Sequence, residues 1–251
     1  MSTLQIQPQF SALEQWKALA AQQGFSFELL ELSLPGALKD ASVINAYRQT
    51  GLIRSLHGAF VDVNPASGEP AIRRLSRQLC EESCTLAVSL GASNVVFHCS
   101  CFPFLRGGYL SQWADSCAEF YRELTVRYPL TVLIENSMDL DPEPLTALMK
   151  AVGSPNVGVC LDIGHANDSR APIEQWFEAL QGHIRYLHLS DNYGSFDDHL
   201  PLGTGTVNWN TVDLLARQAG TVDDITLEVG SLDAVKASTD YLKEHHLFGM
   251  G

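Results

Sequence analysis

The chain contains 251 residues, of which 45% are hydrophobic, with 19 glycines and 11 prolines. This composition is typical of globular proteins and excludes disordered, collagen-like and low-complexity chains. Sixteen Lys and Arg against 29 Asp and Glu give a formal net charge of −13. Because binding to duplex DNA depends on cationic side chains that neutralise phosphates, this charge argues against duplex DNA as a partner.

Targeting and redox signals are sparse in the sequence. No stretch approaches the roughly 18 consecutive apolar residues of a membrane span, and residues 1–10 lack the basic start and apolar core of a secretory signal. We therefore expect a cytoplasmic protein without a membrane partner. The six cysteines form no paired C-x-x-C pattern, and a chain of this length buries a core without disulfides, so reduced thiols are expected.

Short apolar segments alternate with longer segments of helical periodicity along the whole chain. Strands are predicted at residues 4–8, 25–33, 53–60, 94–100, 130–136, 157–163, 184–191 and 224–229. Several of them are apolar almost throughout, which is typical of strands buried on both faces.

Helix signals lie between the predicted strands. They are a possible capping box at Ser11 and Glu14, helix starts at Pro142 and Pro172, and helix ends at Gly153 and Gly220. Residues 231–246 supply a final helix, so strand and helix candidates both number eight. An unbroken series of eight βα units without a linker predicts an α/β fold, a single closed (β/α)8 TIM barrel over residues 1–251.

The active site of such a barrel lies at the carboxyl ends of its strands. The third to eighth predicted strands all end in a carboxylate or an imidazole: His57, His98, Glu135, Asp162 with His165, His188, and Glu228. The following loop adds Asp197 and His199, which are two positions apart and face the same side of an extended segment. This mixture of oxygen and nitrogen ligands suits Zn²⁺, Mn²⁺, Co²⁺ or Fe²⁺ better than Ca²⁺ and predicts an open catalytic metal site.

These residues resemble the xylose isomerase-like TIM-barrel superfamily over nearly the whole chain. That superfamily includes sugar and sugar-phosphate isomerases and epimerases, and also the endonuclease IV family of abasic-site nucleases. The matching motifs occur in the family's order: His57-Gly58-Ala59-Phe60, Phe97-His98, Ile134-Glu135-Asn136, Leu161-Asp162-Ile163-Gly164-His165, His188-Leu189-Ser190-Asp191, residues 197–205 and Leu227-Glu228.

The two branches of the superfamily imply different metal sites. Resemblance to the isomerases implies one divalent ion held by Glu135, Asp162, His188 and Glu228, with the two glutamates as acid and base and His57 as a hydroxyl-binding residue. Resemblance to the nucleases implies three zinc ions and nine ligands, which are these four and His57, His98, His165, Asp197 and His199. The implied cofactor is therefore one to three divalent ions of Zn, Mn or Co.

Three functions follow from this resemblance. The first, favoured by the acidic composition, is an isomerase or epimerase that moves a proton of a sugar or sugar phosphate through an enediolate. The second is a multi-zinc hydrolase, acting on a small phosphodiester rather than on DNA, because the nuclease's DNA-gripping loops have no clear equivalent here. The third is a degenerate barrel that only binds a metal or a sugar, which predicts missing ligands, and none is missing.

Further polar residues near the predicted rim are candidates for contacts with substrate. Arg106, in the loop after the fourth strand, is a candidate for gripping a phosphate or carboxylate, or else a solvated surface residue. Asn136 is a candidate for binding substrate or for orienting its neighbours. His165, Asp197 and His199 are either metal ligands or residues that support the ligands and contact a substrate hydroxyl.

Overall fold

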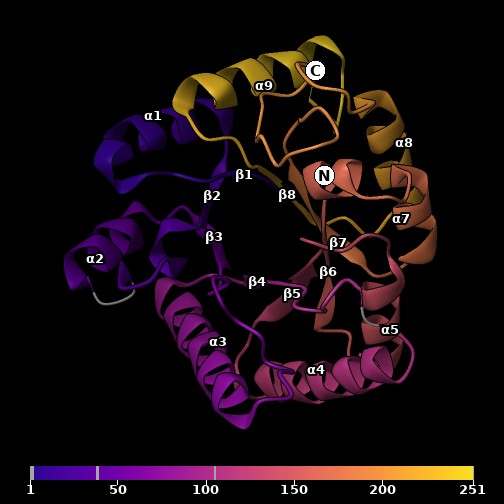
Figure 1. Ribbon diagram of the computed structural model, residues 1–251. Coiled ribbons are helices and arrows are strands. Elements are labelled where there is room, and N and C mark those ends of the chain that lie inside the picture. The colour runs from indigo at the N-terminus through magenta and orange to yellow at the C-terminus, as the bar shows by residue number, and fades with distance from the viewer. Residues whose placement is uncertain (1–2, 38–39, 105, 251) are drawn as a thin grey trace.

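Eight parallel strands close into a barrel in the order of the chain (Figure 1). The computed structural model describes residues 3–37, 40–104 and 106–250. The strands are β1 (Thr3–Ile6), β2 (Ser26–Leu29), β3 (Ile53–His57), β4 (Asn94–His98), β5 (Thr131–Glu135), β6 (Val157–Asp162), β7 (Ile184–Leu189) and β8 (Asp224–Leu227). Pairing of β1 with β8, which sets Ile6 opposite Leu227, completes the barrel and confirms the predicted fold.

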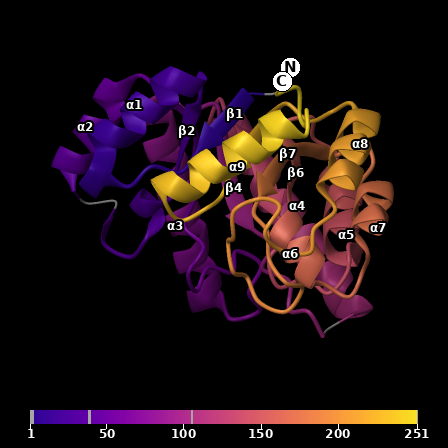
Figure 2. The same ribbon diagram turned by 90° about the horizontal axis from the view of Figure 1, so that it is seen from above.

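Helices surround the barrel on its outside (Figures 1 and 2). They are α1 (Leu13–Gln23), α2 (Ala41–Thr50), α3 (Pro70–Leu90), α4 (Gly108–Arg127), α5 (Glu143–Val152), α6 (Ile163–Asp168), α7 (Ile173–Ala179), α8 (Trp209–Ala219) and α9 (Leu232–Glu244), with 3-10 helices at Phe10–Ala12 and Glu31–Ser33. Among the helices described, none combines the length and hydropathy needed to cross a lipid bilayer.

The observed strands begin close to the predicted positions but end earlier. The second strand, predicted over 25–33, ends at Leu29, and Glu31–Ser33 form a 3-10 helix. The predicted strand is too long because Leu32 is as deeply buried as the strand residues, although the chain has already turned into the loop at the rim. Burial therefore continues past the end of the strand, and an apolar pattern does not show where the backbone turns.

Two helix predictions need correction. The capping box at Ser11 and Glu14 is wrong, because a 3-10 turn precedes α1 and its N-cap is Ala12, whose side chain caps nothing. In the described part of the chain there are nine α-helices rather than eight, since β6 is followed by the short α6 before α7. Asp162 starts α6 by accepting the backbone N–H of His165 at 2.6 Å. The predicted helix ends at Gly153 and Gly220 are present, both with a left-handed backbone.

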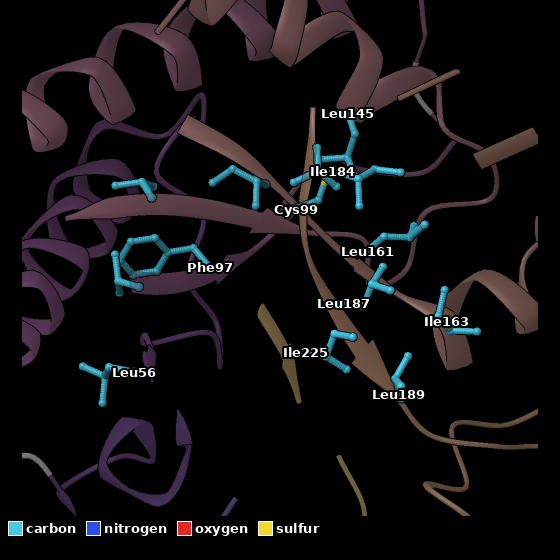
Figure 3. Packing of buried hydrophobic residues seen from close by; sticks show 14 of the residues in the cluster. Leu56, Phe97, Cys99, Leu145, Leu161, Ile163, Ile184, Leu187, Leu189 and Ile225 are labelled. Atoms are coloured by element: carbon cyan, nitrogen blue, oxygen red, sulfur yellow. The ribbon is translucent and has the colours of Figure 1, made fainter. Parts of the chain in front are cut away.

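Two apolar layers flank the strands. The larger lies between the strands and the helices, where Leu161, Leu187 and Ile225 occupy neighbouring positions on β6, β7 and β8 (Figure 3). A smaller buried cluster, which we call the inner cluster, consists of Val96, Leu133, Cys160 and Tyr186. All six cysteines are free and buried.

The inner cluster defines the direction in which the candidate ligands point. Side chains alternate between the two faces of a strand, so the residue two positions later faces the same way. Two positions after the members of the inner cluster stand His98, Glu135, Asp162 and His188. These four side chains therefore point into the barrel at its carboxyl end, directly above the inner cluster.

Gly58 lies beside the first candidate ligand, and its lack of a side chain is required there. A Cβ at this position would overlap the buried ring of Phe97, with Cδ1 at 2.6 Å. We expect Gly58→Ala to lower the free energy of unfolding by about 1–3 kcal/mol, the usual cost of overpacking a core. Urea denaturation measures this, with Gly68→Ala as the control because nothing lies within 4 Å of a Cβ there. Equal midpoints for the two variants would contradict the expectation.

Candidate metal centre

Three carboxylates from neighbouring strand ends meet around His188 in β7. Its Nδ1 atom lies 2.8 Å from Glu228 Oε2, 3.3 Å from Glu135 Oε1 and 3.9 Å from Asp162 Oδ2. One ligand atom from each of these four residues lies within 4.8 Å of all the others. We call these four residues the quartet; all of them are buried.

Glu135 faces a second group of ligands through its other oxygen. Its Oε2 lies 3.3 Å from Nε2 of His57 and 3.6 Å from Nε2 of His98. Two ligands that bind a tetrahedral zinc ion at 2.0–2.1 Å are about 3.3 Å apart, so this spacing fits a shared ion. Burial lowers the pKa of His98 to about 4, which leaves its imidazole neutral and able to act as a ligand at neutral pH.

A third group lies at the open side of the site. Asp197 Oδ2 is 3.3 Å from Nε2 of His165 and 3.0 Å from Nε2 of His199. The side chain of Asp197 is 44% exposed, against 1% for Glu135, so this group is the most accessible of the three. The structure thus brings together all nine residues named from the resemblance, and their role as ligands stays a prediction.

Backbone carbonyls orient three of the histidines. The Nδ1–H groups of His57, His165 and His199 donate to the carbonyls of Gly58, Asn136 and Glu228, at 3.0, 2.8 and 2.9 Å respectively. Because a carbonyl oxygen only accepts, Nδ1 carries the proton in each ring and the lone pair of a neutral ring lies on Nε2. The Nε2 atoms are the ones that face carboxylates, as in histidines that bind metal.

Unsatisfied oxygens show that the residues present fit a cation. Glu135 Oε2, Asp162 Oδ2 and Glu228 Oε2 are buried and accept no hydrogen bond. Leaving buried charged oxygens without a partner is costly, and native proteins rarely do so. These three atoms all face the candidate ligand groups, so divalent ions bound there would satisfy them, and the oxygen and nitrogen donor set suits Zn²⁺, Mn²⁺ or Co²⁺.

Excess negative charge at the site is also visible in shifted pKa values. Burial raises the pKa of Asp162 to about 7, and repulsion from Glu228 and Glu135 adds to the rise. Burial acts to lower the pKa of His199, but its hydrogen bond with Asp197 and the negative charges of Glu228 and Asp197 together outweigh this and raise the pKa to about 9. Both shifts reflect the high density of buried carboxylates in the site, whose repulsion bound cations would relieve.

Members of all three groups line one cavity of about 350 Å³, and the quartet contributes Glu135 and Glu228 to its wall. Its remaining walls are largely apolar and include Leu30, Phe60 and Val229. The ring of Phe60 packs against His57 and His98, with ring centroids 5.0 and 4.9 Å apart. The cavity is thus lined by candidate metal ligands on one part of its wall and mainly by apolar side chains on the rest.

The two predicted substrate-binding residues are engaged elsewhere. Arg106 forms ion pairs with Asp141 at 3.0 Å and Glu143 at 2.8 Å, and it does not line the cavity. Asn136 is buried, and its side-chain amide both donates to the carbonyl of Asp162 at 2.9 Å and accepts from its N–H at 2.7 Å. Asn136 thereby joins the ends of β5 and β6, which corresponds to the orienting role considered for it.

Two residues near the quartet escaped the sequence analysis. Gln7 lines the cavity, and Glu28 is fully buried and contacts His188 at 3.1 Å. The available signal for Glu28 was its position between the apolar residues Phe27 and Leu29 of a predicted strand. Its partner lies 160 positions away, so the sequence does not reveal the contact.

Comparison with known proteins identifies the family. Residues 12–245 match the family model described as xylose isomerase-like TIM barrel. The chain belongs to this family. Its relatives include the uncharacterized protein MJ1311 of Methanocaldococcus jannaschii, 32% identical over 76% of this chain and 69% of the relative. A probable endonuclease 4 of Mycobacterium leprae is 24% identical over 74% of this chain and 76% of the relative.

Solved structures superimpose on nearly the whole chain. A D-tagatose 3-epimerase-like protein has a TM-score of 0.78 and 26% identity, covering 97% of both chains. The TTHB071 protein from Thermus thermophilus, soaked with ZnCl2, has a TM-score of 0.81 and 23% identity, covering 99% of this chain and 98% of that one. The fold of these two structures therefore covers nearly the whole barrel.

Proposed function

We propose that this protein is a hydrolase of small phosphoesters that uses two or three divalent ions. The observation that supports this best is the bridging position of Glu135. One of its oxygens faces His188 at 3.3 Å, and the other faces His57 at 3.3 Å and His98 at 3.6 Å. A one-ion isomerase needs the quartet alone, whereas a second ion explains the additional histidines.

The residues of the chain have separate tasks in this proposal. Divalent ions bound in the centre would supply Lewis acidity, activate a water molecule and stabilise the attacking and leaving oxygens at phosphorus. Glu135 keeps the two buried ligand groups at a fixed separation. Phe60 packs against two ligand histidines and, with Leu30 and Val229, excludes bulk water from one side of the cavity. Asp197, on the exposed side, lies where substrate enters.

Size and charge point to a small substrate. The cavity of about 350 Å³ is at the lower end of the range for small-molecule sites. Among its described lining residues there is no Lys or Arg. Metal ions held by the candidate ligands would therefore be the main positive charges that a bound phosphate meets. With a net charge of −13, the chain suits a compact phosphodiester or phosphomonoester better than duplex DNA. Similarity to proteins named probable endonuclease 4 supports hydrolytic chemistry.

Hydrolysis by the wild type and by His98→Ala tests this proposal. We expect protein loaded with Zn²⁺, Mn²⁺ or Co²⁺ to hydrolyse bis-p-nitrophenyl phosphate or p-nitrophenyl phosphate. His98→Ala is expected to lose roughly 10²-fold or more in kcat/KM, because it removes a ligand of the second group. His183→Ala, at an exposed position, is the matched control and should retain activity. Absence of p-nitrophenol release with all three metals would refute the proposal.

An isomerase or epimerase is the second candidate, because the quartet is complete by itself. Glu135 and Glu228 both lie at His188 Nδ1, at 3.3 and 2.8 Å, and in this reaction they would act as base and acid, with His57 binding a substrate hydroxyl. Similarity to the D-tagatose 3-epimerase-like structure supports it. Its signature is exchange of a carbon-bound proton of a ketohexose in D2O, observed by NMR. Here His98→Ala should leave the quartet loaded and exchange intact, opposite to the result for hydrolysis.

A further inference from the structure

Two polar side chains contact the quartet from the side of β1 and β2, the strands that supply none of the nine predicted ligands: Gln7, directly after β1, and Glu28 in β2. Glu28 lies in β2 and is fully buried. Its carboxylate accepts hydrogen bonds from Gln7 Nε2 at 2.8 Å and from the Tyr186 hydroxyl at 2.6 Å, and it contacts His188 Nε2 at 3.1 Å. A carboxylate is costly to bury unless its oxygens have partners, and these three donors supply them.

His188 is oriented differently from the three histidines that donate Nδ1–H to backbone carbonyls. In His188 it is Nε2 that faces an acceptor, Glu28, while Nδ1 faces the three carboxylates of the quartet. A hydrogen bond from Nε2–H to Glu28 places the proton on that nitrogen and leaves the lone pair on Nδ1. The other tautomer would place a proton among the ligand oxygens instead. A carboxylate partner also increases the basicity of the ligating nitrogen.

Gln7 connects Glu28 with a second member of the quartet. Its Nε2 donates to Glu28 Oε1 at 2.8 Å and to Glu228 Oε1 at 2.9 Å. Both amide hydrogens are thereby used, and Glu228 is held by one oxygen. Its other oxygen, Oε2, accepts no hydrogen bond and lies 2.8 Å from His188 Nδ1. Glu28, Gln7, Glu228 and His188 therefore form a closed ring of contacts.

We propose that Glu28 is a positioning residue for the metal centre, with Gln7 as its link to Glu228. Glu28 acts through His188, because it sets the tautomer and the ring orientation in which Nδ1 is the ligand atom. Gln7 fixes the oxygen of Glu228 that faces the centre. This inference rests on the proposed metal centre and goes beyond it, since neither residue belongs to the nine predicted ligands.

Metal affinity and the tautomer of His188 test the proposal in Glu28→Gln, after circular dichroism has confirmed the fold. Titration with Zn²⁺ or Co²⁺ against a chromophoric chelator is expected to show affinity about 10–100-fold weaker than wild type, the usual cost of losing such a supporting residue. In the wild type loaded with diamagnetic Zn²⁺, ¹⁵N NMR should show the His188 proton on Nε2, and this signal should weaken in the variant at the same Zn²⁺ concentration. Tyr186→Phe is the matched control, because it removes a different hydrogen bond from the same carboxylate and should preserve the tautomer.

Unchanged metal affinity in Glu28→Gln would overturn the proposal. So would a Zn²⁺-loaded wild type in which His188 carries its proton on Nδ1, and this measurement does not depend on whether any variant folds. If Glu28→Gln does not fold, Gln7→Ala offers a second test at a half-buried position. It should weaken metal binding and keep the His188 tautomer. Wild-type metal affinity in Gln7→Ala would mean that Gln7 does not position Glu228. None of these measurements involves turnover, so absence of phosphoester hydrolysis would refute the proposed function and leave the positioning role intact.

Discussion

Replacing Glu135 by Gln is expected to abolish hydrolysis, with kcat/KM lower by roughly 10³-fold or more. Both oxygens of Glu135 face ligand groups, one the quartet and the other the two histidines. A glutamine offers one neutral oxygen and an NH2 group that cannot bind a cation. The substitution therefore disrupts two metal positions at once, and we expect the metal content to fall together with activity.

The control for this variant is Glu119→Gln, which makes the same chemical change at an exposed position of α4. Steady-state kinetics and elemental analysis of both variants should separate the effect at the site from a general effect of lost charge. If Glu135→Gln kept wild-type activity and metal content, Glu135 would not be a bridging ligand and the proposed centre would be wrong.

Asp191→Ala is expected to lower the free energy of unfolding by about 3 kcal/mol or more. The buried carboxylate of Asp191 accepts from the backbone N–H groups of Gly203 (2.9 Å) and Val207 (3.2 Å) and from Trp209 Nε1 (3.0 Å). Hydrogen bonds to a charged group contribute about 1.5–3 kcal/mol each, and the alanine leaves buried donors without a partner. Asp191 thus anchors residues 192–207, the loop that carries the third ligand group.

Because this loop carries the third group, the same variant should also bind less metal. Thermal and urea denaturation of the metal-free protein measure the stability effect, and elemental analysis measures the metal. Asp198→Ala is the matched control, since Asp198 is exposed in the same loop. Equal stability of the two variants would mean that the contacts of Asp191 do not hold the loop.

The barrel and the location of the candidate site follow from short-range patterns in the sequence. Apolar runs such as Val157–Leu161 identify strands buried on both faces, and their regular alternation with helices predicts a closed barrel. A parallel barrel places the carboxyl ends of all its strands at one rim, so polar residues that follow apolar runs, such as Glu135 and Asp162, must come together. This is why the strand-end residues could be named before any contact was known, whereas the set of nine ligands was implied by the family resemblance.

Local sequence patterns do not reveal contacts between residues that lie far apart in the chain. Glu28 meets His188 across 160 positions, and Arg106 meets Asp141 across 35, so neither the positioning role of the first nor the ion pair of the second is visible in local patterns. Helix starts depend in the same way on neighbours, since the 3-10 turn before α1 displaces the capping box expected at Ser11.

The number of metal ions per chain distinguishes the hydrolase from the isomerase. The protein should be purified without chelators and without metal-affinity tags, and its metal content measured by elemental mass spectrometry against protein concentration. We expect two or three divalent ions per chain, and fewer in Glu135→Gln and His98→Ala. One ion per chain, retained in His98→Ala, would contradict a multi-ion hydrolase and favour the isomerase that uses the quartet alone.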